Sequence, residues 1–428
     1  MTHGDEDWMR AGFMFVSCSM SQDRRMADQH ALRSHILRRL TFGPTSGQLS
    51  ELADVSPNDL IDQILGAAPL EPDAPALGSD DDYGRMPQWW LDVMSRPDAG
   101  VHERMTWFWH GHLTSGLDKA SPSLMLRQHR VLREHALGNF RSLLQAITID
   151  AAMLYWLDGA GSNADAPNEN YAREVMELFA LGRDGGYTET DVRAAAKALA
   201  GWWVDGDRDD AVEFDETSGL QATVRVFDRD VNSTSELIDA VCDHPSCGRH
   251  VASALHRFLV GEVPSSERVD QLATLFVAGG LEIFPLLEAI VRDPSFLEVR
   301  LNRPRSAVEW FVAVRHLYDV PLDWWPLEAL GQVPFSPPNV AGWPGESRWV
   351  SVGSTYGKAE VASNNASETA TLDNLDPVAD ILWRAGLVEM SEETQQVLRE
   401  AAASEPSRRD RSSLLHALVA CSPEFSLS

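Results

Sequence analysis

The sequence is poor in cysteine and in basic residues. Only four cysteines occur among 428 residues, too few for a disulfide framework in a chain of this length, which indicates a reducing compartment. Acidic residues outnumber basic residues 64 to 36, and the formal net charge is −28 at pH 7. Such a charge repels phosphate backbones, so nucleic acid is not expected as a partner.

Long apolar runs are also absent. No segment approaches the roughly 18 uninterrupted apolar residues of a membrane-spanning helix, so no membrane association is expected. The first residues, MTHGDEDWMRAGFMFVSCSMSQDRR, place acidic residues where a signal peptide has a basic region, and serines interrupt the short apolar run. This pattern is a poor signal peptide, and it predicts a cytoplasmic protein.

Several motifs of well-known enzymes are missing. The chain has no Walker-type phosphate loop, no Gly-x-Gly-x-x-Gly after a strand and no His-Glu-x-x-His sequence. A Gly-x-Ser-x-Gly nucleophile elbow is absent as well. Nucleotide binding, zincin-type proteolysis and α/β-hydrolase chemistry therefore lack support.

Helical periodicity is what the chain has in abundance. It predicts an all-α fold: a large multi-helix domain over residues 34–350, an N-terminal extension over 1–33 and a helical C-terminal tail over 351–428. Alternation of apolar and polar residues predicts a small β-hairpin insertion at about 204–231, with strands AVEFD and ATVRVFD around the turn ETSGLQ. The Pro- and Gly-rich segment 334–357 is expected to be irregular.

The segment PNENYAREVMELFALG, residues 167–182, carries a narrow polar stripe on an otherwise apolar helix. Asn170, Glu174 and Glu177 fall within about 60° of one another on a helical wheel, with Arg173 beside them. A narrow stripe suggests a buried helix whose carboxylates meet a partner inside the protein. One interpretation is an ion pair between Arg173 and Glu177, and the other is metal binding or acid–base use of Glu174 or Glu177.

Residues near this helix are candidates for substrate binding. The preceding loop, LDGAGSNADAPNEN, contains Asp158, Asn168 and Asn170, and either asparagine can cap the helix. Arg127 and Arg130 lie on one face of the helix predicted over 121–137, where they would pair with the carboxylates or hold an anionic substrate. A plain solvated face is the alternative for both arginines.

The segment WFWHGHLTSG contains His110 and His112 around Gly111. On a helix the two side chains would diverge, whereas in extended chain they share a side, and Gly111 favours the extended form where the helix ends. A His-x-His pair joined by distant carboxylates is a recognised set of ligands for a divalent transition metal. The alternative is two polar residues at a helix terminus that bind backbone groups or acids.

Seven blocks together resemble the domain-of-unknown-function 1800 family of bacterial proteins, over about residues 34–350. These blocks are HILRRLTFGPTSGQL, WFWHGHLTSG, LREHALGNF, AMLYWLDGAGSN, APNENYAREVMELFALG, YTETDVRAAAKALAGWW and PPNVAGWPG. The resemblance implies that a sulfatase-like protein is a candidate partner, and that members are often exported. The family typically carries a His-Asp-x-Gly-x-Lys-like segment in the hairpin, which here reads FDETSGLQATVRVFD, without histidine or lysine.

These observations give one leading hypothesis and two alternatives. The leading hypothesis is a metal-dependent hydrolytic or oxidative enzyme in which His110, His112, Glu174 and Glu177 hold iron, manganese or zinc. An unligated glutamate would act as the general base, and Arg173 would orient it. The alternatives are a non-catalytic scaffold or maturation partner of another protein, and carbohydrate binding through the paired tryptophans at 89–90, 202–203 and 324–325.

Overall fold

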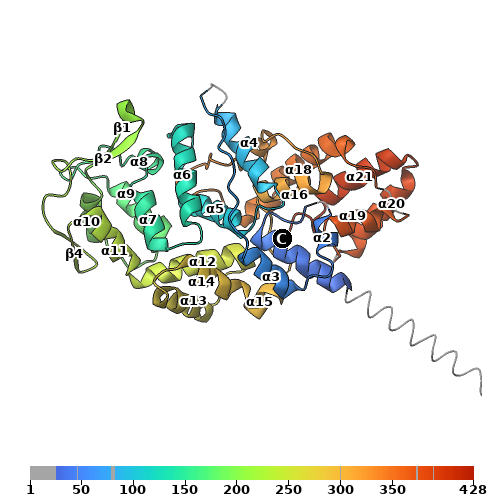
Figure 1. Ribbon diagram of the computed structural model, residues 1–428, viewed down its shortest axis with the longest axis horizontal. Coiled ribbons are helices and arrows are strands. Elements are labelled where there is room, and N and C mark those ends of the chain that lie inside the picture. The colour runs from blue at the N-terminus through green and yellow to red at the C-terminus, as the bar shows by residue number, and fades with distance from the viewer. Residues whose placement is uncertain (1–25, 46, 79–81, 299, 373–374, 389) are drawn as a thin grey trace, which may run out of the picture.

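The fold is known from a computed structural model that describes residues 26–45, 47–78, 82–298, 300–372, 375–388 and 390–428. It is mostly helical and contains two small antiparallel sheets of two strands each, which confirms the predicted fold class. The molecule is elongated, with the sheets at one end and the last helices of the chain at the other (Figure 1). Within the described ranges, no helix combines the length and apolarity needed to cross a membrane.

The first part of the chain is helical over residues 26–40, and residues 1–25 of the predicted N-terminal extension lie outside the described residues. The helices that follow, up to the first sheet, are α2 (Gln48–Glu51), α3 (Pro57–Leu65), α4 (Asp82–Met94), α5 (Val101–His112), α6 (Pro122–His135), α7 (Phe140–Thr148), α8 (Ala151–Trp156), α9 (Glu169–Glu174), the π-helix η1 (Val175–Ala180) and α10 (Glu189–Ala198).

The predicted hairpin is wrong in its pairing, because the segment forms two hairpins. Strand β1 (Trp202–Asp205) pairs with β2 (Ala211–Phe214), and β3 (Val224–Val226) pairs with β4 (Arg229–Val231). The second turn is formed by Phe227 and Asp228, both with positive φ, which is the geometry of a tight two-residue turn. The segment 216–221, predicted as the turn, instead connects the two hairpins. The short 3₁₀ segment η2 (Gly206–Arg208) lies in the first turn.

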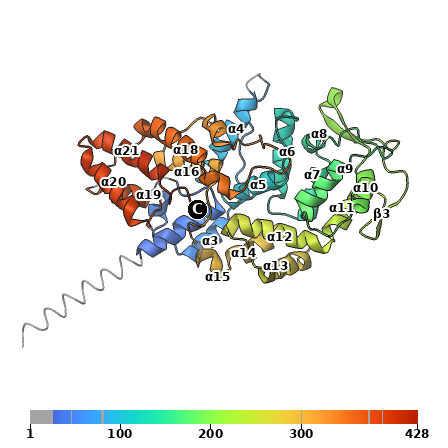
Figure 2. The same ribbon diagram turned by 180° about the vertical axis from the view of Figure 1, so that it is seen from behind.

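The chain after the sheets returns to helices. These are α11 (Thr234–Cys242), α12 (Pro245–Val260), α13 (Ser266–Ala278), α14 (Ile283–Val291), α15 (Pro294–Glu298), α16 (Ala307–Tyr318), α17 (Pro326–Leu330), η3 (Glu346–Val350), α18 (Val352–Asn365), η4 (Ala366–Glu368), α19 (Pro377–Arg384), α20 (Glu392–Ser404) and α21 (Arg408–Cys421). Helices α12, α13 and α14 pack together and form a layer along one side of the molecule (Figure 2).

The segment 334–357 is irregular only in part, because α18 begins at Val352. Ser351 caps this helix by accepting a hydrogen bond from the backbone N–H of Ser354. Gly357 lies inside the helix, where a Cβ atom would come within 3.0 Å of the Leu330 side chain. Here glycine permits close packing of α18 on α17 and does not break the helix.

Two clusters of apolar side chains form the core. The first contains Trp109, Phe140 and Phe179, and the second contains Trp107 and Trp310. Helix α5 contributes Trp109 to one cluster and Trp107 to the other, so this helix lies between them. The C-terminal end of α5 is therefore at the junction of the two halves of the core.

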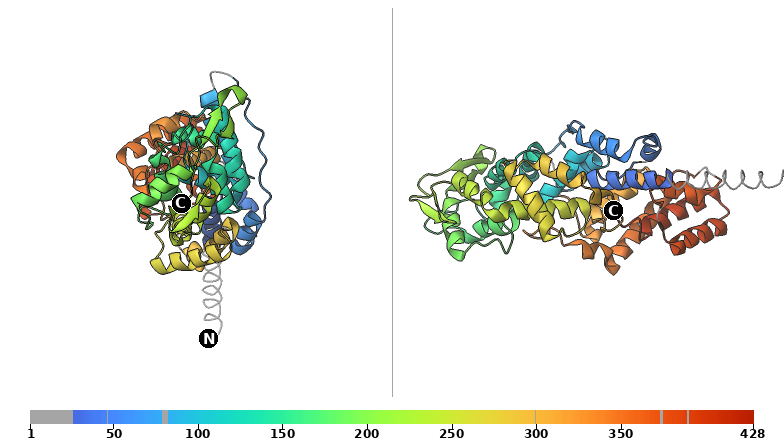
Figure 3. Two further views of the ribbon diagram at one scale, coloured as in Figure 1. Left: turned by 90° about the vertical axis from the view of Figure 1, so that its left-hand side faces the viewer. Right: turned by 90° about the horizontal axis from the view of Figure 1, so that it is seen from below.

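The helix over 26–40 lies beside the C-terminal helices (Figure 3). The rings of His30 and Trp383 stack with centroids 3.5 Å apart, and Arg38 donates a hydrogen bond to the backbone oxygen of Ala385 over 3.0 Å. These contacts join the start of the described chain to α19, so the C-terminal segment packs against the rest of the molecule.

Candidate functional site

Helix α5 continues through Gly111 to His112, which overturns the extended conformation predicted for the His-Gly-His segment. The backbone N–H of Leu113 still bonds to the oxygen of Trp109 at 2.7 Å, in the helical pattern. Two residues apart on a helix, His110 and His112 diverge. They therefore contact different parts of the protein.

His110 is buried and holds a distant loop. Its Nε2 atom accepts a hydrogen bond from the backbone N–H of Phe335 over 3.1 Å. The His110 ring also contacts the rings of Trp90 and Trp343, with centroids 5.1 and 5.4 Å away. Burial lowers the pKa of His110 to about 3, so the imidazole is neutral and can act as this acceptor.

His112 and His250 bind the π-helix that interrupts the carboxylate segment. The Nε2 atom of His112 bonds to the backbone oxygen of Phe179 at 2.9 Å, and that of His250 bonds to the oxygen of Leu178 at 3.0 Å. Burial and the neighbouring His250 lower the pKa of His112 to about 3. Because helix ends leave carbonyl oxygens without intrahelical partners, both histidines satisfy backbone acceptors here.

The carboxylate stripe is partly exposed, unlike the buried stripe that the sequence suggested. Asn170 is exposed, and Glu174 and Glu177 are half-buried. Arg173 does not pair with Glu177 but forms a bidentate ion pair with Glu189, with N···O distances of 2.8 and 2.7 Å. The pairing expected within the helix is therefore replaced by one between α9 and the start of α10.

Glu177 and Glu174 differ in their surroundings. Glu177 pairs with Arg183 at 3.0 Å. Glu174 has no hydrogen-bond or ion-pair partner among the described residues, and burial, followed by the repulsion of Glu177, raises its pKa. Glu174 thus takes up a proton more readily than an ordinary glutamate.

The four predicted metal ligands do not assemble into a shared site. Within the described part of the chain, no three histidine, cysteine, aspartate or glutamate side chains are grouped so that they could hold one metal ion. His110 and His112 are instead used by backbone groups of Phe335 and Phe179. A metal bound through Nε2 of His110 or His112 would have to displace the backbone group that this atom contacts.

The predicted substrate loop has a structural role at the start of α9. Asn168 caps the helix, since its Oδ1 accepts a hydrogen bond from the backbone N–H of Tyr171 at 3.0 Å. The Nδ2 group of Asn168 donates to the backbone oxygens of Leu157 and Asp158, each at 2.8 Å. The Asp158 carboxylate pairs with Lys119 at 2.7 Å.

The two predicted substrate arginines lie away from the carboxylate stripe. Arg127 donates two hydrogen bonds to the backbone oxygen of Asp209, at 2.8 and 2.9 Å, and so holds the turn of the first hairpin. Arg130 is exposed. Neither arginine pairs with Glu174 or Glu177. For Arg130 the alternative interpretation, a solvated helix face, is therefore the one that applies.

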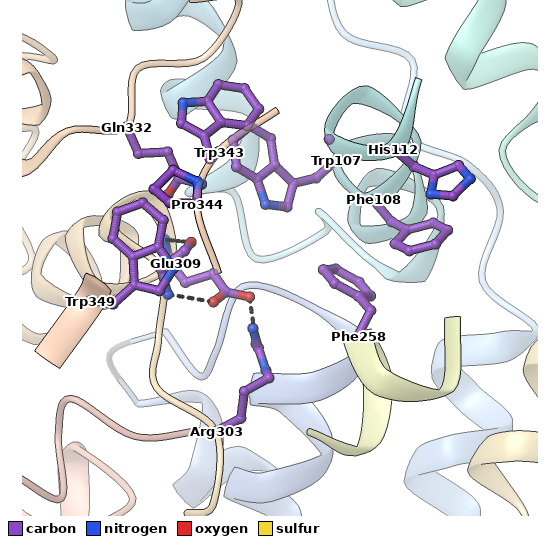
Figure 4. A pocket seen from close by; sticks show the side chains of 12 residues that line it. Trp107, Phe108, His112, Phe258, Arg303, Glu309, Gln332, Trp343, Pro344 and Trp349 are labelled. Atoms are coloured by element: carbon purple, nitrogen blue, oxygen red, sulfur yellow. Dashed lines mark hydrogen bonds and ion pairs between the residues drawn. The ribbon is translucent and has the colours of Figure 1, made fainter. Parts of the chain in front are cut away.

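A cavity of about 240 Å³ lies beside the end of α5. Its walls are Trp107, Phe108, Gly111, His112, Phe258, Arg303, Ser306, Glu309, Gln332, Trp343, Pro344 and Trp349. Trp343, Pro344 and Trp349 stand on one side and Phe108 and Phe258 on the other, with Glu309 and Arg303 between them (Figure 4). The cavity thus combines aromatic walls with a charged end.

The loop that closes this cavity is fixed to α5 and to the turn after it. The backbone N–H of Leu117 donates to the oxygen of Phe335 at 2.8 Å, and the hydroxyl of Thr114 donates to the oxygen of Val340. Gly342 has φ +77°, and a Cβ atom there would lie 2.9 Å from the backbone oxygen of Gly111. Only glycine accommodates this close approach in the left-handed region.

Among the described residues that line the cavity, Glu309 is the only one with a carboxylate, and its oxygens are already used. Oε1 accepts hydrogen bonds from Arg104 and from Arg303, the latter at 2.6 Å, and Oε2 accepts the backbone N–H of Ser306 at 2.8 Å. Burial alone would raise the pKa of Glu309, but Arg104 and Arg303 reverse this effect and hold it well below its usual range. Glu309 is therefore ionised and acts as a fixed acceptor.

The polar groups that remain for a ligand are donors. Gln332 accepts the backbone N–H of Val308 with Oε1 at 2.9 Å, which leaves its Nε2 amide as a donor for the cavity. Arg303 uses Nη2 for Glu309, and its buried Nε has no hydrogen-bond partner in the described part of the protein. The indole Nε1–H of Trp343 is also buried without a partner. This cavity is complementary to a ligand that carries acceptors.

The sequence interpretation missed most of these cavity residues, although two signals were present. Ser306 and Glu309 have the spacing of a capping box, and the structure shows both of its hydrogen bonds. The PPNVAGWPG segment, which contains Trp343 and Pro344, belongs to the Pro- and Gly-rich stretch 334–357, and long loops of this kind often carry function. Neither signal indicated that the two segments would meet.

Comparison with known protein families gives a match over nearly the whole chain. The family described as "Protein of unknown function (DUF1800)" matches residues 35–427. The chain belongs to the DUF1800 family. The match includes the C-terminal helices α18–α21, beyond the blocks noted in the sequence. No curated protein and no solved structure matches the chain.

Two of the blocks that resemble DUF1800 proteins line the cavity together. WFWHGHLTSG contributes Trp107, Phe108 and His112, and PPNVAGWPG contributes Trp343 and Pro344. These blocks are more than 200 positions apart in the sequence. Family resemblance and a concave polar site therefore coincide at this cavity.

Proposed function

We propose that this DUF1800 protein binds a small organic acid in the cavity beside the end of α5. The observation that carries the proposal is the occupied carboxylate of Glu309, which leaves Arg303 and Gln332 to present donors. A ligand carboxylate would accept from these two groups. Its apolar part would contact the rings of Trp107, Trp343 and Trp349.

The charges around the cavity support an anionic ligand. Three buried guanidiniums, those of Arg104, Arg303 and Arg305, surround the single carboxylate of Glu309. Burial lowers the pKa of Arg104 to about 10, which leaves it charged at neutral pH. Buried charge without a counter-charge is unfavourable, so an anion that enters this end of the cavity offsets it.

The volume of the cavity indicates a small ligand, and the pKa values of the residues that line it favour binding over acid–base catalysis. A volume of about 240 Å³ lies below the roughly 300–1,000 Å³ of pockets for drug-sized ligands. The pKa of His112 is about 3 and that of Glu309 lies well below its usual range. Neither group changes protonation near neutral pH, which a general acid or base must do.

The experiment is isothermal titration calorimetry with benzoate and glucuronate, each compared with its neutral primary amide. Fluorescence of the tryptophans in the walls provides a second signal. We expect an acid to bind with a Kd below about 1 mM and its amide to bind at least about tenfold more weakly. Equal affinity for acid and amide, or no binding of either acid, would overturn the proposal.

Gln332→Glu is the sharpest variant, because the new carboxylate retains the acceptor for Val308 and replaces the amide donor with a like charge. We expect at least about tenfold weaker acid binding, with unfolding by urea little changed. Trp325→Ala is the matched control, since Trp325 is 64% exposed and does not line the cavity. An unchanged affinity in Gln332→Glu would count against this site.

A further inference from the structure

A second cavity, of about 450 Å³, lies at the base of the first hairpin, at the end of the molecule opposite α19–α21 (Figure 1). Its walls are Gly161, Ser162, Gly201, Trp202, Trp203, Glu213, Phe214, Asp215 and Ser218. None of these residues belongs to the first cavity. The lining joins aromatic rings, carboxylates and hydroxyls from three separate segments of chain.

Backbone hydrogen bonds hold the three segments together. Gly161 donates to the oxygen of Trp202 and Gly201 donates to the oxygen of Ser162, both at 2.8 Å. Asp215 donates to the oxygen of Gly201, also at 2.8 Å. Because the bonds are between backbone groups, the shape of the cavity is set before a ligand arrives.

Glycine is required where these segments meet. Gly201 has φ +98°, and a Cβ atom there would lie 2.7 Å from Gly219 and from the ring of Phe214. A Cβ atom on Gly219 would lie 2.5 Å from the same ring. Phe214 therefore packs directly over backbone, and its position beside the cavity is fixed.

Two aromatic rings are exposed at this cavity. Trp203 is 38% exposed and Phe214 is 45% exposed. Trp202 is held differently, since its indole N–H donates to Thr234 at 2.9 Å and its ring contacts Phe214 with centroids 5.0 Å apart. Trp202 and Trp203 are successive strand residues and point to opposite faces, so the sequence pair does not form one platform. Trp203 and Phe214 supply the accessible rings.

The polar groups of the second cavity are mainly acceptors, in contrast to the first. Hydroxyl groups of Ser218 and Thr217 lower the pKa of Asp215, which is therefore ionised at neutral pH. Glu213 adds a second carboxylate and pairs with Arg208. Two carboxylates repel an anionic ligand, whereas hydroxyl groups can donate to them.

We propose that this second cavity binds a neutral carbohydrate. A sugar ring has an apolar C–H face that packs on an aromatic ring, and its hydroxyls donate hydrogen bonds to carboxylates. In this site the C–H face would contact Trp203 or Phe214, and the hydroxyls would reach Glu213, Asp215 and Ser162. The proposal uses no residue of the first cavity and does not depend on the acid ligand proposed there.

The experiment is calorimetric titration of the full chain with the hexaoses of the malto-, cello-, xylo- and chito- series, all of them neutral. We expect at least one oligosaccharide to bind, and Trp203→Ala to weaken it at least about tenfold while Trp203→Phe retains most of the affinity. Trp203 lies at the surface, so circular dichroism should show both variants folded. Trp325→Ala and Gln332→Glu are expected to bind sugar as the unaltered protein does.

Three results would overturn this proposal. The first is absence of binding for all four series at millimolar concentration. The second is an equal loss of oligosaccharide affinity in Trp203→Ala and Trp325→Ala, which would show that Trp203 makes no specific contact with the sugar. The third is binding of glucosamine, titrated in the same way, when none of the four neutral series binds, which would assign the cavity to a cation attracted by Glu213 and Asp215.

Discussion

The Nε2 atom of His110 accepts a hydrogen bond from the backbone N–H of Phe335, 3.1 Å away, and so joins two segments separated by 225 positions in the chain. A protonated imidazole has no acceptor nitrogen, so this bond requires the neutral ring. Burial, which lowers the pKa of His110 to about 3, provides that state over the whole neutral range. A histidine predicted to bind metal thus positions the loop that closes the first cavity.

Replacing His110 should separate its acceptor role from its packing role. His110→Leu leaves the buried N–H of Phe335 without a partner, and we expect a loss of about 1–3 kcal/mol in the free energy of unfolding. His110→Gln offers an amide oxygen to the same N–H and should lose less. Urea denaturation of the three proteins checks this, and equal losses in both variants would show that the hydrogen bond contributes nothing.

The buried histidines should make the protein sensitive to acid. Burial lowers the pKa of His35 and of His110 from the ordinary 6.5 to about 3. Between these values the unfolded chain binds a proton that the native protein excludes, so stability is complete above pH 6.5 and is lost as the pH falls. Each histidine contributes about 1.4 kcal/mol per pH unit to that loss.

The pH dependence can be assigned with a matched variant. The free energy of unfolding in urea is measured at pH 7, 6 and 5 for the unaltered protein and for His110→Gln, which cannot titrate. We expect the slope of stability against pH to be smaller in the variant by about 1.4 kcal/mol per unit below pH 6. Identical slopes would mean that folding does not lower the pKa of His110.

Glu309 should stabilise the folded protein, because its carboxylate is the counter-charge of buried guanidiniums. Glu309→Gln removes the carboxylate that Arg104 and Arg303 share, and we expect a loss of about 3–5 kcal/mol because two buried guanidiniums then lack a counter-charge. Asp98→Asn is the control, since it breaks the exposed pair with Arg96 and should leave unfolding unchanged. A small effect of Glu309→Gln in urea denaturation would contradict the assignment of positive charge to this region.

Two glycines of one loop should respond differently to substitution. Gly342→Ala places a Cβ atom 2.9 Å from the oxygen of Gly111 at φ +77°, and the left-handed conformation alone costs roughly 1–2 kcal/mol. We expect lower stability and weaker binding in the first cavity. Gly345→Ala meets nothing within 4 Å at φ −62° and should change neither property. Thermal unfolding and the acid titration test the pair, and equal effects would refute the argument.

Local sequence signals predicted the helical fold well. The spacing of Thr188 and Asp191 predicts a capping box, and both of its hydrogen bonds are present at the start of α10. The turn between β3 and β4 was not predictable, because Phe227 and Asp228 are not the usual residues of a two-residue turn. Phe227 adopts positive φ where its N–H donates to Asp191 at 2.9 Å and its ring contacts His244. A tertiary contact therefore outweighs local preference.

The candidate site depended still more on contacts between distant segments. Spacing placed Glu174, Glu177 and Arg173 on one helix, but it could not show that Arg173 pairs with Glu189 on the next helix. The first cavity needs α5, the residues around Glu309 and the loop at Trp343 to come together. No local pattern specifies that meeting, because each segment is stabilised by its own caps and its own buried face.

The separation of the cavity walls along the chain has a consequence for how the protein folds. Trp107 and Phe108 are made early in synthesis, whereas Trp343 and Trp349 follow more than 200 residues later. Helix α5 can form locally, but the enclosure around Glu309 cannot close until the later residues have left the ribosome. Ligand affinity at this cavity is thus a late marker of folding, and a partly folded chain would retain helices while failing to bind.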